Sequence, residues 1–322
     1  MKIKLLITLS ILILISFSCD DNFNPFGDYK EKYILTCLLD GNSDFQVATL
    51  SKSYFTGTFN PYDNTMDPSL ESAEIRIWLS DSVYLLRDST IERQDSSRYK
   101  TSFKFYYTEQ VRPTSGKTLE IEALLPTGKR LRSLTVTPNE ISFSNQNPNV
   151  IPPVDQNYLT FIWQAQSTYT FCDIRILVTY YKNENGINIK YEKEIPIAYK
   201  SHGGADEPVY PPAARQTVVS YPMDVITKFL ESISAGDDNK SNYYIEIKPK
   251  VEVLVMDEAL SRYYSSTSQS LNDLSVRLDE NDYTNIEGGF GIFGTFMTKR
   301  YSAISFIASY LQSFGYNVIY NE

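Results

Sequence analysis

The sequence contains one histidine, three cysteines and no run of more than two consecutive Lys or Arg residues. Zinc and related metals usually take several His or Cys ligands, whereas His202 has only the acids Asp206 and Glu207 beside it. We therefore expect no metal site, and any Ser-His-Asp triad would depend on His202 alone. A G-x-S-x-G motif is also missing. Because the net charge is −9 and basic runs are absent, we expect no nucleic-acid partner.

Long hydrophobic runs are also scarce, since the only one lies between Leu5 and Ile15. Lys2 and Lys4 precede this run, and the whole segment has the layout of a secretory signal peptide. The run is shorter than the ~20 residues that a membrane-spanning helix needs. The segment Ser16-Phe17-Ser18-Cys19 resembles a lipobox, in which the cysteine accepts a lipid. We expect residues 1–18 to be a lipoprotein signal peptide and Cys19 to be the lipidated residue; an ordinary signal peptide with a stray cysteine is the alternative.

The two remaining cysteines, Cys37 and Cys172, each lie within an apolar, strand-like run. Buried free thiols are the simpler prediction for such positions. A disulfide between them requires that their two segments pack together, because the Cα atoms of a disulfide lie within about 7 Å. The sequence leaves this pairing open.

The rest of the composition is that of a folded protein, with 42% hydrophobic and 14% aromatic residues in a chain of 322. We expect residues 19–30 to form a tether and residues 31–138 an N-terminal β-sandwich domain, because short β-rich runs alternate there with turn residues. The Pro- and Asn-rich segment 138–157 marks a boundary. Residues 139–322 are expected to form a second, β-rich domain with helical segments.

The second domain begins with strand-like runs and a predicted hairpin turn at Asn185-Gly186. Apolar residues then recur at helical spacing from Pro222 to Leu230 and from Asp257 to Leu274, with a strand-like run between them. A terminal amphipathic helix is expected from Ala303 to Phe314, with a strand as the alternative. The predicted fold class is mainly β, with two immunoglobulin-like or β-sandwich domains, the second of which carries a few helices.

A glycine-rich segment from Gly289 to Gly294 formally matches the dinucleotide-binding pattern G-x-G-x-x-G. That pattern needs a buried strand before it, a helix after it and an acid about twenty residues later. None of these is present, so we expect neither a nucleotide nor another cofactor here. The structural interpretation is that the glycines let this segment pass close to another strand while Phe290, Ile292 and Phe293 pack.

The segment from Asn285 to Gly294, which follows the Tyr263-Tyr264 pair, resembles the C-terminal signature of a Bacteroidetes lipoprotein family, domain of unknown function 4249. The run from Lys32 to Phe55 is similar to the opening of that family. The resemblance implies immunoglobulin-like β proteins at the outer membrane, often associated with TonB-dependent receptors and without an established activity. The acids Asp20 and Asp21 also resemble the surface-export signal of Bacteroidetes lipoproteins, although Asp next to the cysteine is similar to the inner-membrane retention signal of enteric bacteria; we favour the first interpretation.

Together these features predict a lipid-anchored, non-catalytic accessory or binding module that works beside a TonB-dependent receptor. We expect Cys19 to attach it to the outer membrane with its body facing outward; a body facing the periplasm is the alternative. No catalytic residue is identified. A surface glycan hydrolase with two carboxylates, or an adhesion or structural protein of the envelope, are the competing hypotheses. The 25 tyrosines could supply flat binding surfaces, or could fill half-buried positions on strands.

Overall fold

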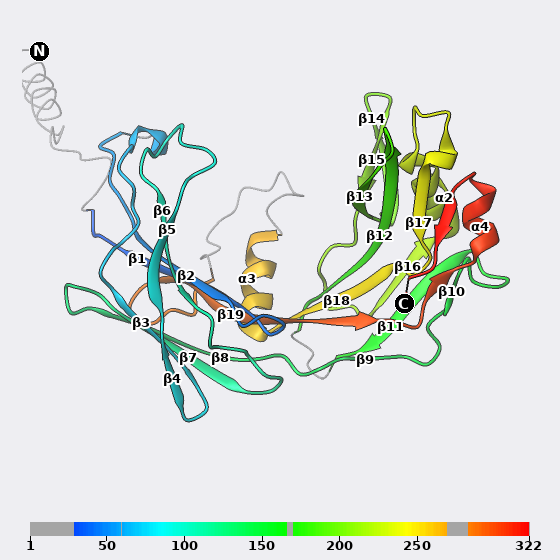
Figure 1. Cartoon of the computed structure of the whole chain (residues 1–322). Coiled ribbons are helices and arrows are strands. Elements are labelled where there is room, and N and C mark those ends of the chain that lie inside the picture. The colour runs from blue at the N-terminus through cyan, green and yellow to red at the C-terminus, as the bar shows by residue number, and fades with distance from the viewer. Residues whose placement is uncertain (1–28, 59, 166–169, 269–282, 322) are drawn as a thin grey trace, which may run out of the picture.

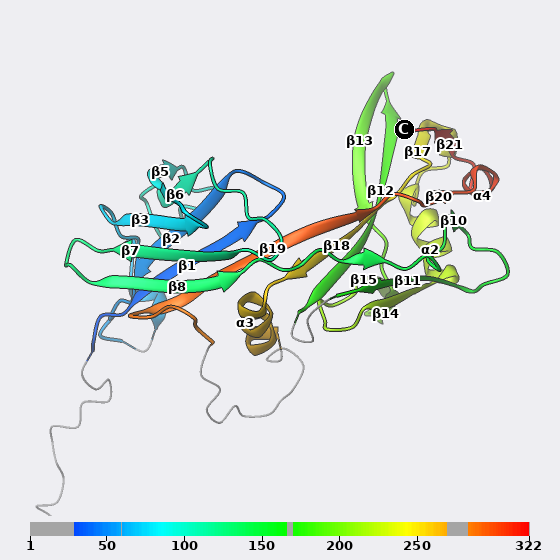
Figure 2. The same ribbon diagram turned by 90° about the horizontal axis from the view of Figure 1, so that it is seen from below.

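The computed structural model describes residues 29–58, 60–165, 170–268 and 283–321. The chain forms two β-rich lobes joined by long strands, and both lobes project to the same side of this connection (Figures 1 and 2). The predicted mainly β class is confirmed, since 47% of the described residues lie in strands and 12% in helices. Cys19 and the rest of the expected leader lie outside the described residues.

One ten-stranded sheet runs through both lobes. Its order is β21-β17-β12-β18-β19-β1-β2-β6-β5, and β13 pairs with β12 outside this path. Its strands are β1 Tyr33–Asp40, β2 Gln46–Lys52, β5 Arg87–Ile91, β6 Phe103–Thr108, β12 Cys172–Glu184, β13 Ile187–Glu194, β17 Tyr243–Glu246, β18 Lys250–Met256, β19 Phe290–Tyr301 and β21 Asn317–Ile319. The β1–β19 and β17–β21 pairs are parallel, and the other pairs in this sheet are antiparallel.

The first lobe is a sandwich. Its β19-β1-β2-β6-β5 portion of the long sheet faces a second sheet of order β4-β3-β7-β8. The strands of the second sheet are β3 Glu74–Leu79, β4 Ser82–Leu85, β7 Thr118–Leu124 and β8 Arg130–Val136. Buried and exposed residues alternate strictly along β8, as expected for a strand with one face in a core. Leu35, Leu39, Ile75, Ile121 and Leu131 are among the buried side chains between the sheets.

The second lobe packs β12, β17 and β18 against shorter sheets and two helices. The short strands are β9 Ser142–Phe143, β10 Val150–Ile151, β11 Tyr158–Gln164, β14 Ala198–His202, β15 Ala205–Val209, β16 Val218–Pro222 and β20 Ser305–Phe306. Their sheets are β16-β11-β9, β10-β20 and β14-β15. Phe161, Trp163, Tyr221 and Phe306 are large, fully buried side chains of this core.

The expected helices are present but their bounds differ from the prediction. Helix α2 covers Met223–Ile233 and buries Ile226, Phe229, Leu230 and Ile233 in the second core. Helix α3 covers Glu258–Ser268, and the remainder of the predicted segment lies outside the described residues. The terminal helix α4 is only Ala308–Ser313, because Ser305 and Phe306 form β20 beside β10 instead. Two short 3-10 segments, η1 Pro61–Asp63 and η2 Lys240–Asn242, complete the elements.

Two strand predictions were refined and the hairpin was confirmed. The hairpin between β12 and β13 turns at Asn185 and Gly186, whose φ angles are +54° and +86°. The run from Tyr243 to Asp257 is two strands, β17 and β18, instead of one. The run from Ser82 to Ser89 divides between β4 and β5, which belong to different sheets.

Strand β19 connects the two lobes. Its first half pairs with β1, from Ile34 opposite Phe290 to Asp40 opposite Phe296, and its second half pairs with β18. As a result, Phe293 packs in the first core although the expected second domain, residues 139–322, contains it. Residues 139–322 therefore supply strands to both lobes.

Glycine makes the close β1–β19 approach possible. A Cβ atom on Gly289 would lie 2.7 Å from the Tyr33 carbonyl oxygen, and one on Gly291, whose φ is +112°, would overlap the Leu35 carbonyl. The predicted close passage of the glycine-rich segment is therefore confirmed. The predicted packing holds for Ile292 and Phe293, which are buried, but is wrong for Phe290, which is 40% exposed beneath the Lys32 ammonium group.

Candidate interaction surface

An aromatic face lies on the outside of the first lobe. On β6, Tyr106 points into the sandwich core, so its neighbours Phe105 and Tyr107 point to the opposite face of the sheet. Phe103 continues this row toward the start of the strand. Phe45, just before β2, extends it beyond Tyr107. We call these four residues, Phe45, Phe103, Phe105 and Tyr107, the aromatic ladder.

Each ring of the aromatic ladder contacts the next. The centroid separations are 6.4 Å from Phe103 to Phe105, 6.0 Å from Phe105 to Tyr107 and 5.6 Å from Tyr107 to Phe45. These separations fall within the range favoured by aromatic pairs. Phe45 is 48% exposed and Ile91, which lies opposite Phe103 on β5, is 60% exposed. The ladder is therefore exposed at Phe45 and beside Ile91, whereas Phe103, Phe105 and Tyr107 are half-buried.

A cation lies at the Tyr107 end of the ladder. The guanidinium carbon of Arg87 lies 4.8 Å from the centroid of the Tyr107 ring, and Arg87 is also 3.0 Å from Glu109. Cation–π contacts at exposed positions contribute about 0.5–1 kcal/mol. The surface thus combines apolar rings with a charge at its border, which is typical of protein-binding surfaces.

The two long loops at the end of the first lobe form a second aromatic group. Arg98, in the β5–β6 loop, lies 5.6 Å, 5.2 Å and 4.9 Å from the ring centroids of Tyr54, Tyr62 and Tyr99. It also donates a 2.7 Å hydrogen bond to the Tyr54 hydroxyl. We call Arg98 and these three tyrosines the Arg98 cluster. It joins the β2–β3 loop to the β5–β6 loop.

Arg93 connects the Arg98 cluster to the ladder. Its guanidinium carbon lies 5.2 Å from the ring centroids of both Tyr99 and Phe103. Arg93 also forms a 2.6 Å ion pair with Asp67, which accepts further hydrogen bonds from the Ser69 backbone and the Thr101 hydroxyl. Burial acts to raise the pKa of Asp67, but these hydrogen bonds outweigh it and hold the pKa well below its ordinary value. Asp67 therefore fixes the loops as a carboxylate.

A glycan hydrolase with two carboxylates requires neighbouring acids with a raised pKa on at least one of them. Among the described groups, the only such pair with both pKa values raised lies in the second lobe. Asp173 on β12 is bound by Arg175 at 3.1 Å, and burial raises its pKa despite that arginine. Burial also raises the pKa of Glu194, with Arg175 opposing the shift and Asp173 adding to it. Nearby, the hydroxyl of Tyr221 is buried and has no hydrogen-bond partner within the described part of the chain. This group can hold a proton near neutral pH more readily than an exposed acid.

A further carboxylate, Asp257, lies where the two lobes meet. It lines a cavity of about 190 Å3 together with Thr137, Ala165, Val255 and other residues. Its oxygens accept hydrogen bonds from the Leu260 amide at the start of α3, the Thr135 hydroxyl and the Thr295 amide. Burial raises the pKa of Asp257 although all these hydrogen bonds lower it. With its oxygens already occupied by protein donors, Asp257 serves to join elements and not to bind a ligand.

The other residues considered from the sequence do not form a site. Cys37 and Cys172 are free and buried, and they belong to the first and second cores respectively. His202 ends β14, where it pairs with Ala205. Within the described residues no group of three or more His, Cys, Asp or Glu side chains could hold a metal ion. Over the same residues, no helix is both long enough and apolar enough to cross a membrane.

The ladder was not identified from the sequence. In the run from Phe103 to Tyr107 aromatic residues occupy both faces of the strand, so alternation alone does not show which face is exposed. Lys104 lies on the same inner face as Tyr106. Because lysine is usually exposed, its position in the sequence suggests wrongly that this face of the strand, and not the face of Phe105 and Tyr107, is in contact with solvent. The usable signal was the adjacent β5 sequence, Arg87–Ile91, which is polar on both faces and predicts a sheet edge.

Comparison with known families gives one match. A family model described as Domain of unknown function (DUF4249) matches residues 20–302, which is most of the chain. A comparison with curated proteins finds no match. The matched range includes the first lobe, the β1–β19 pairing and the second lobe up to the end of β19, and it begins directly after Cys19.

Proposed function

The chain belongs to the DUF4249 family, and we propose that it is a lipid-anchored, non-catalytic envelope protein that binds a partner through the aromatic ladder. The proposed anchor is Cys19, which follows a signal-peptide-like leader and resembles the acylated cysteine of a lipobox. The proposed location is the outer membrane of a Bacteroidetes bacterium, with the body facing outward. The acidic pair Asp20-Asp21 after the cysteine supports that orientation.

The observation that supports binding is the solvent contact of the aromatic ladder. Phe45 at one end of the ladder is 48% exposed, and Ile91, which lies opposite Phe103 at the other end, is 60% exposed. Exposed apolar patches with a polar border are characteristic of protein-binding surfaces. The proposed partner is a TonB-dependent outer-membrane receptor, which would meet a lipid-anchored neighbour in the plane of the same membrane.

The test is chemical crosslinking and capture of the tagged protein from the cells that make it. In the variant Phe45→Ser with Tyr107→Ser, capture of a β-barrel receptor is expected to fall at least about tenfold, because central aromatic residues dominate binding energy. The matched control is Tyr158→Ser, which removes a ring that is 55% exposed on β11 in the other lobe. Circular dichroism of each variant checks that the fold is retained.

The anchor is tested separately with Cys19→Ala, which should move the body into the soluble fraction. If the variant stays in the membrane, acylation of Cys19 is not the anchor. If the ladder variant captures as much receptor as the Tyr158→Ser control does, the ladder is not the binding surface. If wild-type protein captures only copies of itself, an adhesion or structural role replaces the accessory role.

A glycan hydrolase is the second candidate, favoured by the raised pKa values of Asp173 and Glu194. Such an enzyme would release reducing sugar from surface polysaccharides, and Glu194→Gln would abolish that release. A wild-type protein that hydrolyses none of a panel of α- and β-linked glycans would remove this candidate.

A further inference from the structure

We infer that the end of the first lobe rests on the lipid bilayer through exposed side chains of its β2–β3 loop. This inference rests on the proposed lipid anchor but goes beyond it, because a tether alone leaves the body free to turn. The chemistry required is an apolar or amphipathic contact with the headgroup region. The residues concerned are Tyr62 and Met66, with Phe55 in the same loop; we call this group the loop tip.

The described chain begins at the loop tip. The Tyr29 hydroxyl donates a 2.5 Å hydrogen bond to the Ser53 carbonyl oxygen, and the Tyr29 ring stacks on Phe55 with centroids 5.7 Å apart. Tyr29 lies only ten positions after Cys19, a length that reaches at most about 35 Å when fully extended. A lipid on Cys19 therefore keeps the loop tip within a few nanometres of the membrane surface.

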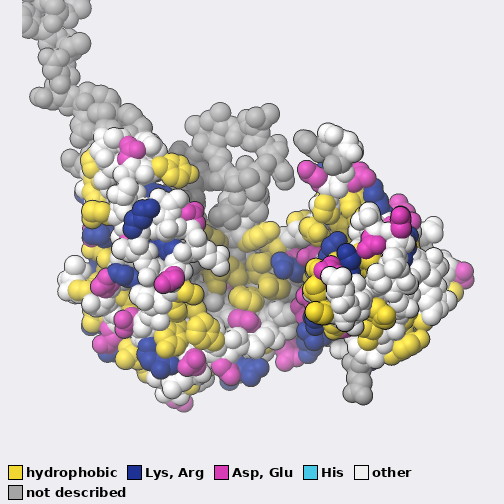
Figure 3. All heavy atoms as spheres, turned by 45° about the horizontal axis from the view of Figure 1, so that its top comes forward, with side chains coloured by type: hydrophobic (Ala, Val, Ile, Leu, Met, Phe, Trp, Pro, Cys, Tyr) yellow, Lys and Arg dark blue, Asp and Glu magenta, His cyan; other side chains and the backbone are white. Residues whose placement is uncertain are grey.

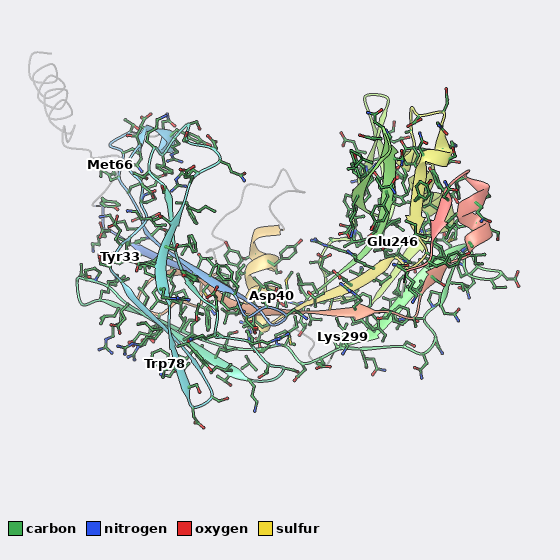
Figure 4. The ribbon with its side chains drawn as sticks, in the orientation of Figure 1. Tyr33, Asp40, Met66, Trp78, Glu246 and Lys299 are labelled. Atoms are coloured by element: carbon green, nitrogen blue, oxygen red, sulfur yellow. The ribbon has the colours of Figure 1, made fainter. Side chains whose placement is uncertain are left out.

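The loop tip also exposes the side chains that membrane interfaces favour. Tyr62 is 73% exposed, Met66 is 77% exposed and Phe55 is 52% exposed. Tyrosine has an apolar ring and a polar end, which suits the boundary between acyl chains and water. Figure 4 places Met66 at the end of the lobe from which the chain begins, and Trp78 at the opposite end. Exposed side chains of this kind therefore lie on the side of the anchor, and Val83 and Leu85 are also exposed at the opposite end of the lobe.

The charges around the loop tip indicate which lipid chemistry is involved. Acids outnumber bases in the two loops: Asp63, Asp67, Glu71, Glu92 and Asp95 against Arg93, Arg98 and Lys100. Asp67 is already paired with Arg93 at 2.6 Å, and the side chain of Arg98 lies against three tyrosine rings. Such a surface has no excess of positive charge to attract anionic lipid. The contact should form on zwitterionic phosphatidylcholine and change little with salt.

Contact of the loop tip with the bilayer also sets the orientation of the aromatic ladder and the Arg98 cluster. Phe103 at one end of the aromatic ladder lies against Arg93, and the ladder runs along β6 away from the loops. With the loop tip on the bilayer, the ladder rises from the membrane and faces sideways. Figure 3 shows that hydrophobic side chains also gather between the two lobes.

The experiment uses full-length protein, purified in detergent and reconstituted into vesicles of phosphatidylcholine with bromine near the start of the acyl chains. Bromine quenches nearby tryptophan fluorescence. In Met66→Trp, the fluorescence added relative to wild type should fall about twofold, since interfacial side chains reach about 5–10 Å into the bilayer. The matched control is Val83→Trp on β4, a position that is 54% exposed at the end of the lobe where Trp78 lies.

Flotation of the vesicles separates the possible outcomes. Protein that floats and shows quenching only in Met66→Trp supports the inference. Protein that floats without quenching of Met66→Trp overturns the bilayer contact but leaves the anchor intact, and the loop tip would then belong to a protein partner. Protein that does not float overturns both. Equal quenching of Met66→Trp and Val83→Trp would show an unoriented body and would also overturn the inference.

Discussion

The carboxylate of Asp257 accepts a 2.6 Å hydrogen bond from the hydroxyl of Thr135, a residue 122 positions earlier in the chain. The same carboxylate oxygen accepts a 2.5 Å hydrogen bond from the amide of Thr295 on β19. Asp257 thus ties β8 of the first lobe to the strand that links the lobes, and at the same time caps α3 through the Leu260 amide.

Replacing Asp257 should destabilise the whole protein. The variant Asp257→Ala leaves the buried Thr295 and Leu260 amides without their acceptor, which costs about 3 kcal/mol in the free energy of unfolding. Urea unfolding measures the change. The matched control is Glu258→Ala, which removes the neighbouring exposed carboxylate and its pair with Arg262 and should change stability by less than about 0.5 kcal/mol. Equal effects of the two substitutions would contradict the role given to Asp257.

The parallel β1–β19 pair should depend on Gly291. In Gly291→Ala, the new Cβ would overlap the Leu35 carbonyl, and no rotation of a side chain relieves a clash with backbone. The cost should exceed about 4 kcal/mol or prevent folding. Gly128→Ala is the control, because Gly128 also has a positive φ, +80°, but nothing lies within 4 Å of its Cβ position. That control should cost only about 1–2 kcal/mol, measured by the same urea titration.

The thiols of the folded body should resist modification. Burial raises the pKa of Cys37 to about 12, and burial also raises the pKa of Cys172, against a smaller opposing effect of Trp163. Because the thiolate is the reactive form, an aromatic disulfide reagent at about pH 8 should label neither residue before unfolding and both after it. A fast-reacting thiol in folded, extracted protein would instead be Cys19, and would show that this residue is not acylated.

The free energy of unfolding should depend on pH through the ionisation of Asp67. Its pKa is lower in the folded protein than its ordinary value of 3.8, so the unfolded chain binds the proton more readily. The stabilisation is therefore complete above pH 3.8 and is lost as the pH falls from there toward the folded pKa. The difference in urea midpoint between wild type and Asp67→Asn should be constant near neutral pH and should shrink below about pH 3.

The control for this prediction is Asp44→Asn, which removes an exposed acid whose nearest cation, on Arg112, is 3.8 Å away. Exposed pairs at this distance contribute little. A difference between wild type and Asp67→Asn that grows as the pH falls would show that the sign of the Asp67 shift is wrong.

Much of the fold follows from local sequence. The short β-rich runs between turn residues located β3, β7 and β8, and the Asn185-Gly186 pair located the β12–β13 turn. The glycines from Gly289 to Gly294 predicted a close backbone approach. What they could not identify was the neighbouring strand, because any strand with an accessible edge satisfies that requirement equally well.

The parts that sequence did not predict depend on contacts between distant segments. The terminal helix is shortened because Ser305 and Phe306 gain a partner in β10, about 155 residues earlier in the chain, and this pairing outweighs the helical spacing of their side chains. The aromatic ladder was missed because Tyr106 and Tyr107 have similar chemistry but lie on opposite faces. Only the position of the second sheet decides which of them is buried.

The place of β19 beside β1 also affects how the protein is completed during synthesis. The ribosome makes the N-terminus first and so delivers β1 early, but the partner on one side of that strand, residues 290–296, emerges only after most of the polypeptide has been made. Until then one edge of β1 stays open and the first core lacks Phe293. The nascent protein is therefore exposed to aggregation and to proteases for most of its synthesis, and the first lobe closes only when the last tenth of the chain arrives.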